Sequence, residues 1–247
     1  MRWILAGLTV WVTSVVGGAA SLAVSSSAQW VLFDLASLNT FVRLANETLH
    51  FVNERVPGEP VPFLPEIRHG VGLGLAETFG GLFRFGLSVS VMGANTRTQG
   101  TWAQGGTSHP VDIALEVGWA AFMIEVGFVL IPDVLTLGIS AGWGSYQIGY
   151  RSDFPQTLPT DWSLPFLPRS EDATYTGDGP GGMVAVQVTL PLGQGISAGI
   201  EAGFRIIPAS VPRAGSAVLD LNSDGMGDPV GFSGPWLGLT VRLQFNL

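Results

Sequence analysis

One short segment near the C-terminus combines residue types and a spacing that suit metal chemistry, the run D-L-N-S-D-G-M-G-D at residues 220–228. Oxygen-bearing side chains recur at alternate positions and a glycine occupies the sixth, which lets a looped chain wrap a hard cation such as Ca²⁺. The ligands in that interpretation are the side chains of Asp220, Asn222, Asp224 and Asp228 and the main-chain carbonyl of Met226. The alternative is a polar surface loop, because Gly, Asn and Asp favour turns without any metal.

The spacing in this segment resembles the calcium loops of dockerin and thrombospondin type-3 repeats. It departs from an EF-hand, whose twelfth position carries a bidentate glutamate, because Gly231 stands there in this chain. Calcium is the one cofactor that the sequence predicts.

Residues that could carry catalysis are few. Of the three histidines, His109 alone has a hydroxyl neighbour, Ser108, with Asp112 three residues further on. An esterase or deacylase is therefore a minor hypothesis, since a catalytic triad is defined by geometry and not by proximity along the chain. The chain has no cysteine nucleophile and no lysine for a phosphate-binding loop. We expect a protein that is not an enzyme.

The composition narrows the class of protein. Charged residues make up 12% of the chain, about half the usual ~25%, whereas hydrophobic residues make up 47%. The net charge is -8 and the eleven basic residues, all arginine, are scattered along the chain, which argues against a nucleic-acid partner. High hydrophobicity with little charge suits a membrane protein, but a helical one needs apolar runs of about 20 residues.

Only the N-terminus supplies such a run. Arg2 is followed by an apolar stretch and then by small residues up to Ala28, which is the order of a secretory signal peptide over residues 1–28. Cleavage after Ala28 is the first choice, and cleavage after Ala20 or Ala23 is an alternative. An uncleaved N-terminal anchor is the other interpretation. Either way, we expect the protein to be exported.

Two short regions follow the predicted signal peptide. Residues 29–56 contain an amphipathic helix from Asp34 to Val56, because apolar residues recur there at spacings of three and four. Residues 57–68 form a proline-rich linker, in which four prolines exclude regular structure.

From residue 69 to residue 247 the pattern becomes strict alternation of apolar residues with polar or small ones, which is typical of strands with one apolar face. Glycines follow this alternation and interrupt it at turns. The alternation predicts eight strands, at about residues 70–79, 82–94, 111–119, 122–131, 134–150, 183–191, 195–206 and 236–247.

Four features favour a transmembrane barrel over a soluble sandwich. Charged residues within strands lie opposite the apolar face, as the polar interior of a barrel permits, and strands of about ten residues suit a tilted crossing of a bilayer. Aromatic residues gather near strand ends, and short turns alternate with long polar loops. The predicted lumen polar cluster consists of Arg84, Asp112, Glu116, Glu125, Glu201, Arg205 and Arg242.

With these features the chain resembles the small bacterial outer-membrane β-barrel proteins, a porin-like architecture, over residues 69–247 and the signal peptide. The tail G-L-T-V-R-L-Q-F-N-L resembles their C-terminal assembly signal, although it ends in Leu247 where the family usually has an aromatic residue. The resemblance implies an all-β, antiparallel, up-and-down barrel in the cell outer membrane. Its implied partners are outer-membrane lipid and the barrel assembly machinery.

Two points of the architecture stay open. The segment Trp119–Phe122 is a poor hairpin turn because it has no Gly, Asn or Asp, so residues 111–131 are alternatively one long bulged strand. In that case an eighth strand comes from upstream or the barrel is larger. The N-terminal helix either plugs the barrel or lies on the periplasmic membrane surface.

The leading functional hypothesis is an outer-membrane barrel that is structural or that binds or passes a small apolar compound. An eight-stranded barrel has room for side chains or one small ligand and not for an open channel. A helical plug with passage of an apolar compound would resemble the long-chain fatty-acid transporters, whose barrels are considerably larger. The alternative from another class is a secreted soluble β-sandwich that binds a surface partner.

Overall fold

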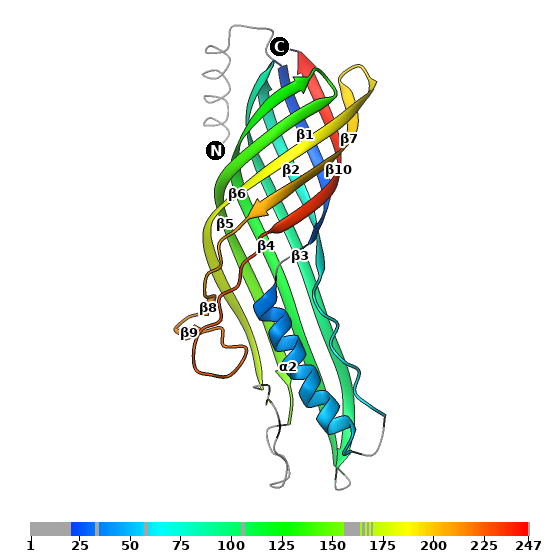
Figure 1. The fold of residues 1–247 in the computed structure, drawn as a ribbon, viewed down its shortest axis with the longest axis vertical. Coiled ribbons are helices and arrows are strands. Elements are labelled where there is room, and N and C mark those ends of the chain that lie inside the picture. Colours follow the sequence, from blue (N-terminus) through cyan, green and yellow to red (C-terminus); the bar gives the residue numbers. More distant parts are fainter. Residues whose placement is uncertain are drawn as a thin grey trace.

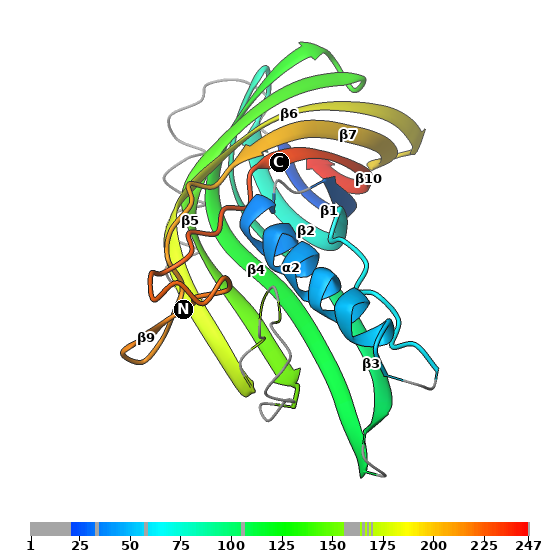
Figure 2. The ribbon, with the colours of Figure 1, turned by 60° about the horizontal axis from the view of Figure 1, so that its bottom comes forward.

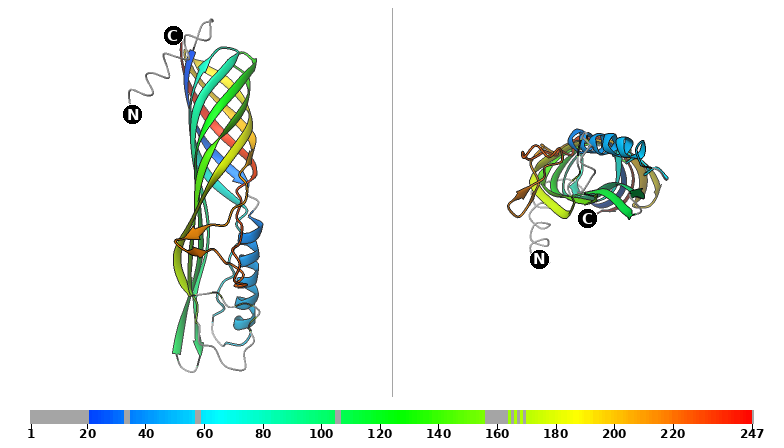
Figure 3. Two further views of the ribbon diagram at one scale, coloured as in Figure 1. Left: turned by 90° about the vertical axis from the view of Figure 1, so that its left-hand side faces the viewer. Right: turned by 90° about the horizontal axis from the view of Figure 1, so that it is seen from below.

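The computed structural model describes residues 21–32, 35–56, 59–104, 107–155 and 170–246, together with Leu164, Phe166 and Pro168. Eight long strands form a closed antiparallel ring, seen from the side in Figure 1 and from below in Figure 3. They are β1 (Ser21–Leu32), β2 (His69–Gly80), β3 (Phe83–Gln104), β4 (Thr107–Ile131), β5 (Leu135–Asp153), β6 (Glu171–Gly193), β7 (Ile196–Ile206) and β10 (Gly234–Asn246).

The pairing of β1 with β10 and of β5 with β6 closes the ring, so within the ring every long strand is paired on both sides. A two-strand ribbon of β8 (Arg213–Ala214) and β9 (Ala217–Val218) attaches to β6, and the helix α2 (Ala36–Asn53) connects β1 to β2 through a linker. The predicted fold class, an antiparallel up-and-down barrel of eight strands with an amphipathic helix, is confirmed. A two-sheet sandwich is excluded because the sheet is continuous around the ring.

The eighth strand comes from upstream of the predicted barrel. β1 begins at Ser21 and pairs along its length with β2 and β10, so the barrel wall does not start at residue 69. The side chains of this segment alternate between the two faces, as a strand requires. Val24, Ser26 and Ala28 face outward, and the residues between them face the interior of the ring. Cleavage after Ala23 or Ala28 would cut this strand. Residues 1–20 lie outside the described residues, and cleavage after Ala20 remains a prediction that leaves β1 whole.

The predicted pair of strands 111–119 and 122–131 is in fact the single strand β4. Its register with β3 and β5 runs unbroken through Trp119, Ala120 and Ala121, without a turn or a bulge at that point. The apolar face nevertheless changes sides there: Phe122 and Ile124 point outward and are exposed, whereas Trp119 and Val117 point inward and are buried. The same change occurs in β5 between Trp143 and Tyr146.

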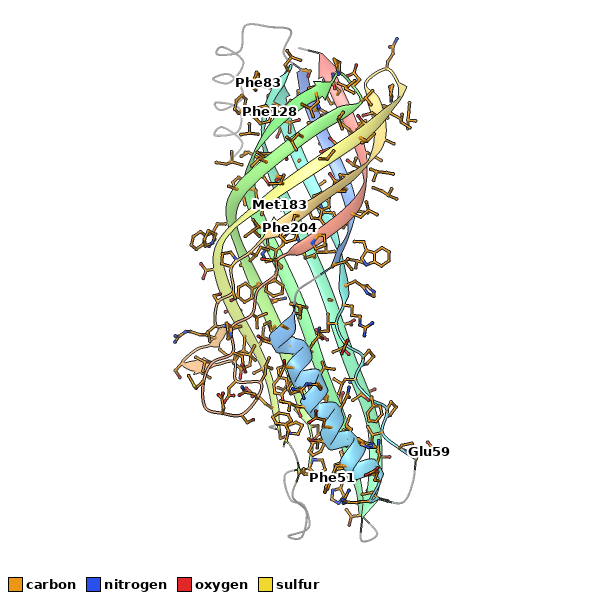
Figure 4. All side chains as sticks on the ribbon, viewed as in Figure 1. Phe51, Glu59, Phe83, Phe128, Met183 and Phe204 are labelled. Carbon is orange, nitrogen blue, oxygen red and sulfur yellow. The ribbon has the colours of Figure 1, made fainter. Side chains whose placement is uncertain are left out.

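This inversion marks where the strands leave the membrane. Around the ring, the outward side chains are large, apolar and exposed, as a lipid-facing surface requires. On β3 this belt runs from Phe83 to Val91, roughly 27 Å at about 3.4 Å per residue. A tilt of about 40° reduces that to roughly 20 Å, comparable with the band of about 25 Å of outer-membrane barrels. Figure 4 shows Phe83 and Phe128 at one edge of the belt and Phe204 near the other.

Beyond the belt, β3 to β6 continue past the ring and are covered on their inner face, as Figures 1 and 2 show. We call this part, made of α2, the linker 59–68, the distal parts of β3–β6 and residues 207–233, the external half. Its interior is a packed apolar core in which Phe41 of α2 contacts Tyr150 and Phe166, and Trp102 contacts Phe154. The outer faces meet water and the inner faces meet this core, which is why the alternation inverts.

The helix α2 therefore belongs to the external half, at the end of the ring opposite the short turns, and does not plug the ring. It follows the end of β1 that is opposite the short turns, where Leu32 pairs with His69. Its apolar stripe, from Leu38 to Val52, is buried against the extended strands and the linker. Among the described residues, no helix combines the length and hydrophobicity needed to cross a membrane.

The proline-rich linker forms neither helix nor strand, as predicted, but it is tightly held. Its side chains at every third position, Val61, Leu64 and Ile67, are buried against α2. The carbonyls between them, those of Pro62 and Pro65, accept hydrogen bonds from two inward-facing threonines of β3. A three-residue period is that of polyproline II, which has no internal hydrogen bonds and relies on such external partners.

Candidate functional site

The ring encloses a polar chamber within the membrane-spanning part. The inward positions of the strands carry small and polar side chains there, so the interior stays partly empty although an eight-stranded ring is narrow. The enclosed cavity has a volume of about 80 Å³. Its polar lining residues are Ser25, Ser27, Gln29, Ser88, Ser90, Glu125, Thr136, Ser140, Gln187, Glu201 and Trp236.

Arg205 crosses the lumen above this chamber. Its side chain comes from β7 and is fully buried, yet its Nη1 lies 2.6 Å from the sulfur of Met92 on β3 and its Nη2 lies 3.4 Å from Oε1 of Gln29 on β1. The guanidinium carbon is 4.5 Å from the ring centroid of Trp119 on β4, a cation–π contact. One side chain thus connects four strands.

Trp236 of β10 completes this closure. Gly203 makes room for its indole, because a Cβ at that position would lie 2.8 Å from the indole nitrogen. We call Gln29, Met92, Trp119, Arg205 and Trp236 the sealing layer. All five are at least nine-tenths buried. The layer separates the polar chamber from the apolar core of the external half.

The predicted lumen polar cluster is only partly correct. Arg84, Glu125, Glu201, Arg205 and Arg242 do point into the ring, and Gln29 lies 3.4 Å from a carboxylate oxygen of Glu201. The other two predicted members, Asp112 and Glu116, lie on the outer face of the external half.

The sequence predicts Asp112 and Glu116 in the lumen because they oppose an apolar face, but in the structure that face packs into the external core. They therefore point outward, to solvent. Asp112 accepts hydrogen bonds from Nε and Nη2 of Arg97 at 2.9 and 2.6 Å. These hydrogen bonds from Arg97 hold the pKa of the Asp112 carboxyl below its ordinary value.

The predicted calcium loop lies in the external half, in an exposed turn of residues 220–226. The carboxylate of Asp220 accepts hydrogen bonds from the backbone N–H groups of Asp224 and Gly225, at 3.2 and 3.0 Å. Asp228 instead accepts the N–H of Leu221 at 2.6 Å. Among the described residues, no three His, Cys, Asp or Glu side chains gather closely enough to hold a metal. The calcium assignment therefore depends on Asn and carbonyl oxygens as well and remains a prediction.

The minor catalytic hypothesis gains no geometric support. Ser108 and His109 are consecutive residues of β4, and consecutive side chains of a strand point to opposite faces. His69 instead packs edge-on against Trp30, with ring centroids 5.6 Å apart, and His50 lies 3.4 Å from the carboxylate of Glu54. That the protein is not an enzyme remains a prediction.

Sequence reasoning missed a hollow on the lipid-facing surface over β10, β1, β2 and β3, with a volume of about 860 Å³. Small residues of the wall, Ala28 and Gly93 among them, form its floor, and larger side chains rise around it. The apolar rim residues are Trp30, Val71, Leu73, Val91, Ile200, Leu237 and Leu239. The sequence predicts residues 1–28 as a signal peptide, so Ala28 is not expected in the barrel wall. The pattern of small outward residues flanked by leucines becomes visible only when Ala28 is placed in a strand.

No known protein family matches the chain by sequence, and no curated protein matches it. Solved structures of similar shape exist. Ail, the attachment invasion locus protein of Yersinia pestis, has a TM-score of 0.40 and 10% identity over 92% of this chain and 98% of its own. The outer membrane protein OprG from Pseudomonas aeruginosa has a TM-score of 0.43 and 8% identity, over 93% and 97%. The outer membrane protease OmpT from Escherichia coli has a TM-score of 0.38 and 10% identity, over 92% and 96%.

These likenesses concern overall architecture alone. The closed ring and the continuous apolar belt are what an outer-membrane barrel needs, since every backbone polar group within lipid must be paired. The predicted barrel architecture is confirmed, and its lipid-facing belt is what the predicted outer-membrane location requires.

Proposed function

We propose that this protein is a non-conducting outer-membrane barrel whose working part is the external half, a rigid folded domain displayed at the cell surface. The observation that carries the proposal is the course of Arg205, which crosses the lumen and joins four strands. Above it lies an apolar core and below it a small chamber. Neither offers a solute a water-filled path through the described residues.

The size of the chamber supports this proposal. A buried water needs about 10–15 Å³ of cavity volume measured in this way, so the chamber has room for roughly six waters. Pockets for drug-sized ligands measure about 300–1,000 Å³. A sugar or amino acid does not fit between the chamber walls unless the sealing layer moves.

The construction of the external half also supports display. Outer-membrane barrels have short periplasmic turns and longer extracellular loops, so the end with the turns at Gly80 and Asp133 faces the periplasm. The external half then faces outward. The external half has a buried core, and its linker is held by hydrogen bonds. It is therefore rigid, and its polar outer faces are held in fixed positions, as a binding or structural role requires.

Conductance tests the closed lumen. In planar bilayers and in liposome-swelling assays with small sugars, we expect no conductance and no swelling, with a general porin as the positive control. Arg205→Ala should also remain silent, because the apolar core lies above the sealing layer. Stable channels in the unmodified protein would contradict the proposal.

Surface labelling tests the display. An epitope inserted after Gly215, in the exposed turn between β8 and β9, should bind antibody on intact cells. The matched control is the same epitope after Gly193, in a short turn, which should be labelled only after permeabilisation. The opposite pattern would place the external half in the periplasm and overturn the proposal.

The hollow over β1 supports a second candidate function, binding of a small apolar compound from the membrane. Its lining is almost entirely apolar and Trp30 lies at its rim. A brominated alkane should quench the fluorescence of Trp30 in the unmodified protein and not in Ala28→Phe, which fills the hollow. Ala141→Phe, another outward alanine on β5, is the matched control. Equal quenching in all three proteins would exclude this function.

A further inference from the structure

A second polar space opens at the periplasmic end of the ring, below the chamber. It has a volume of about 390 Å³ and is bounded by short turns and by the ends of β3, β7 and β10. We call it the vestibule. Its lining includes the side chains of Arg84, Asp133, Ser197, Arg242 and Gln244.

Two arginines of the vestibule form no direct ion pair with the described residues. Arg84 and Arg242 come from β3 and β10, and their side chains are 7% and 6% exposed. Neither forms an ion pair within 4 Å with the described residues, and the Nε of each has no hydrogen-bond partner. Within the described part of the chain, the one hydrogen bond that either guanidinium donates is a long one, from Nη1 of Arg84 to Thr136 at 3.4 Å.

The charges in the vestibule do not balance. Its lining carries two positive charges and one negative charge, that of Asp133, whose residue is exposed to solvent. Glu125 also attracts both arginines but lines the chamber above. The two guanidinium groups repel each other. A positive vestibule in a chain of net charge -8 is therefore a local feature that calls for a counter-charge.

We propose that the vestibule binds a soluble oxyanion, a phosphate or phosphate monoester, from the periplasmic side. Guanidinium groups match phosphate oxygens with two parallel hydrogen bonds, and two such groups on opposite parts of the ring would hold one anion between them. Ser197 and the amide of Gln244 are further donors within the same lining. Binding of the anion does not depend on the closed lumen, whereas its periplasmic source rests on the orientation given in the proposed function.

Thermal unfolding tests the proposal. The full-length barrel is unfolded in a maltoside detergent and followed by tryptophan fluorescence, with inorganic phosphate compared with chloride at equal ionic strength. Saturating phosphate should raise the unfolding temperature by about 5 °C. Arg242→Gln and Arg84→Gln should abolish the rise. Arg213→Gln, on the exposed β8, is the matched control and should keep it.

Arg242→Met separates binding from folding. In chloride it should unfold at the same or a higher temperature than the unmodified protein, because it removes an uncompensated buried charge. In phosphate it should lose its advantage. No phosphate effect in the unmodified protein, or an equal effect in the Arg84 and Arg242 variants, would overturn the proposal. A response to phosphatidic acid micelles but not to inorganic phosphate would overturn the soluble source.

Discussion

The side-chain amide of Asn46 on α2 clamps the backbone of Leu64 in the linker, donating to its carbonyl at 2.9 Å and accepting from its N–H at 2.7 Å. Asn39 and Asn53 do the same for Ile67 and Val61. Seven residues of helix advance about 10.5 Å, and three residues of polyproline II advance about 9.3 Å. The two distances nearly match. An asparagine at every seventh residue of the helix can therefore bind every third residue of the linker.

Removal of the central clamp should loosen the external half and leave the ring intact. Asn46→Ala leaves the N–H and carbonyl of a half-buried backbone segment without their partner, which should cost about 1–3 kcal/mol. We expect faster proteolysis of the linker and an unchanged heat-modifiable shift of the barrel on gels. Asn95→Ala, on the exposed outer face of β3, is the control. Equal protease resistance of the two variants would show that the clamps are dispensable.

The apolar residues of β4 change faces between Trp119 and Phe122. We therefore expect an arginine substitution on the outer face of β4 to have different effects on stability on the two sides of this point. Ile124→Arg places a charge in the apolar belt and should lower the free energy of unfolding from vesicles by about 2–4 kcal/mol. Glu116→Arg lies eight residues away on the same face but in water, and should change it by less than about 0.5 kcal/mol. Urea unfolding in lipid vesicles measures both. Similar losses would mean that the belt extends over the external half.

The ion pair of Arg97 with Asp112 predicts a weak acid dependence of the external half. Since the pKa of Asp112 is lower in the folded protein than in the unfolded chain, its stabilising contribution is complete above the unfolded pKa. It is lost as the pH falls through the folded value. Comparing the proteolysis of the external half between pH 7 and pH 3 should show a smaller acid effect in Asp112→Asn. The effect is small because the pair is solvent-exposed.

Calcium binding by residues 220–228 remains a prediction with a direct test. Ca²⁺ should slow proteolysis of this segment, and Asp224→Ala should abolish the protection, because its carboxylate is one of the expected ligands. Asp153→Asn, elsewhere in the external half, should keep it. If Ca²⁺ and a chelator give the same cleavage rate in the unmodified protein, the segment is a polar loop only.

Much of the fold could be read from local patterns. Strict alternation located most strands, Gly80 and Gly81 marked a hairpin, and the apolar stripe located α2 to within a few residues. The asparagines at 39, 46 and 53 and the linker residues at 61, 64 and 67 carried a further signal, matched periods of seven and three, that predicts their pairing. The four prolines of the linker mask this signal, because they indicate an irregular segment when each residue is read by its own propensity.

The site was less accessible to sequence reasoning. Arg205 is one inward arginine among several in the sequence, and only the ring brings it beside Gln29 and over Trp119. Arg84 and Arg242 are 158 positions apart in the numbering, and strand closure alone places them in one vestibule.

The sequence by itself determined which side chains share a face of each strand, because alternation is a local property of the extended chain. Only the tertiary structure decided what each face meets. Phe122 and Trp119 belong to one unbroken strand, and their faces are opposite because lipid surrounds the first while α2 and the linker supply an apolar interior for the second. Asp112 was misplaced for the same reason: a change of surroundings, unlike a change of register, leaves no mark in the spacing of residues.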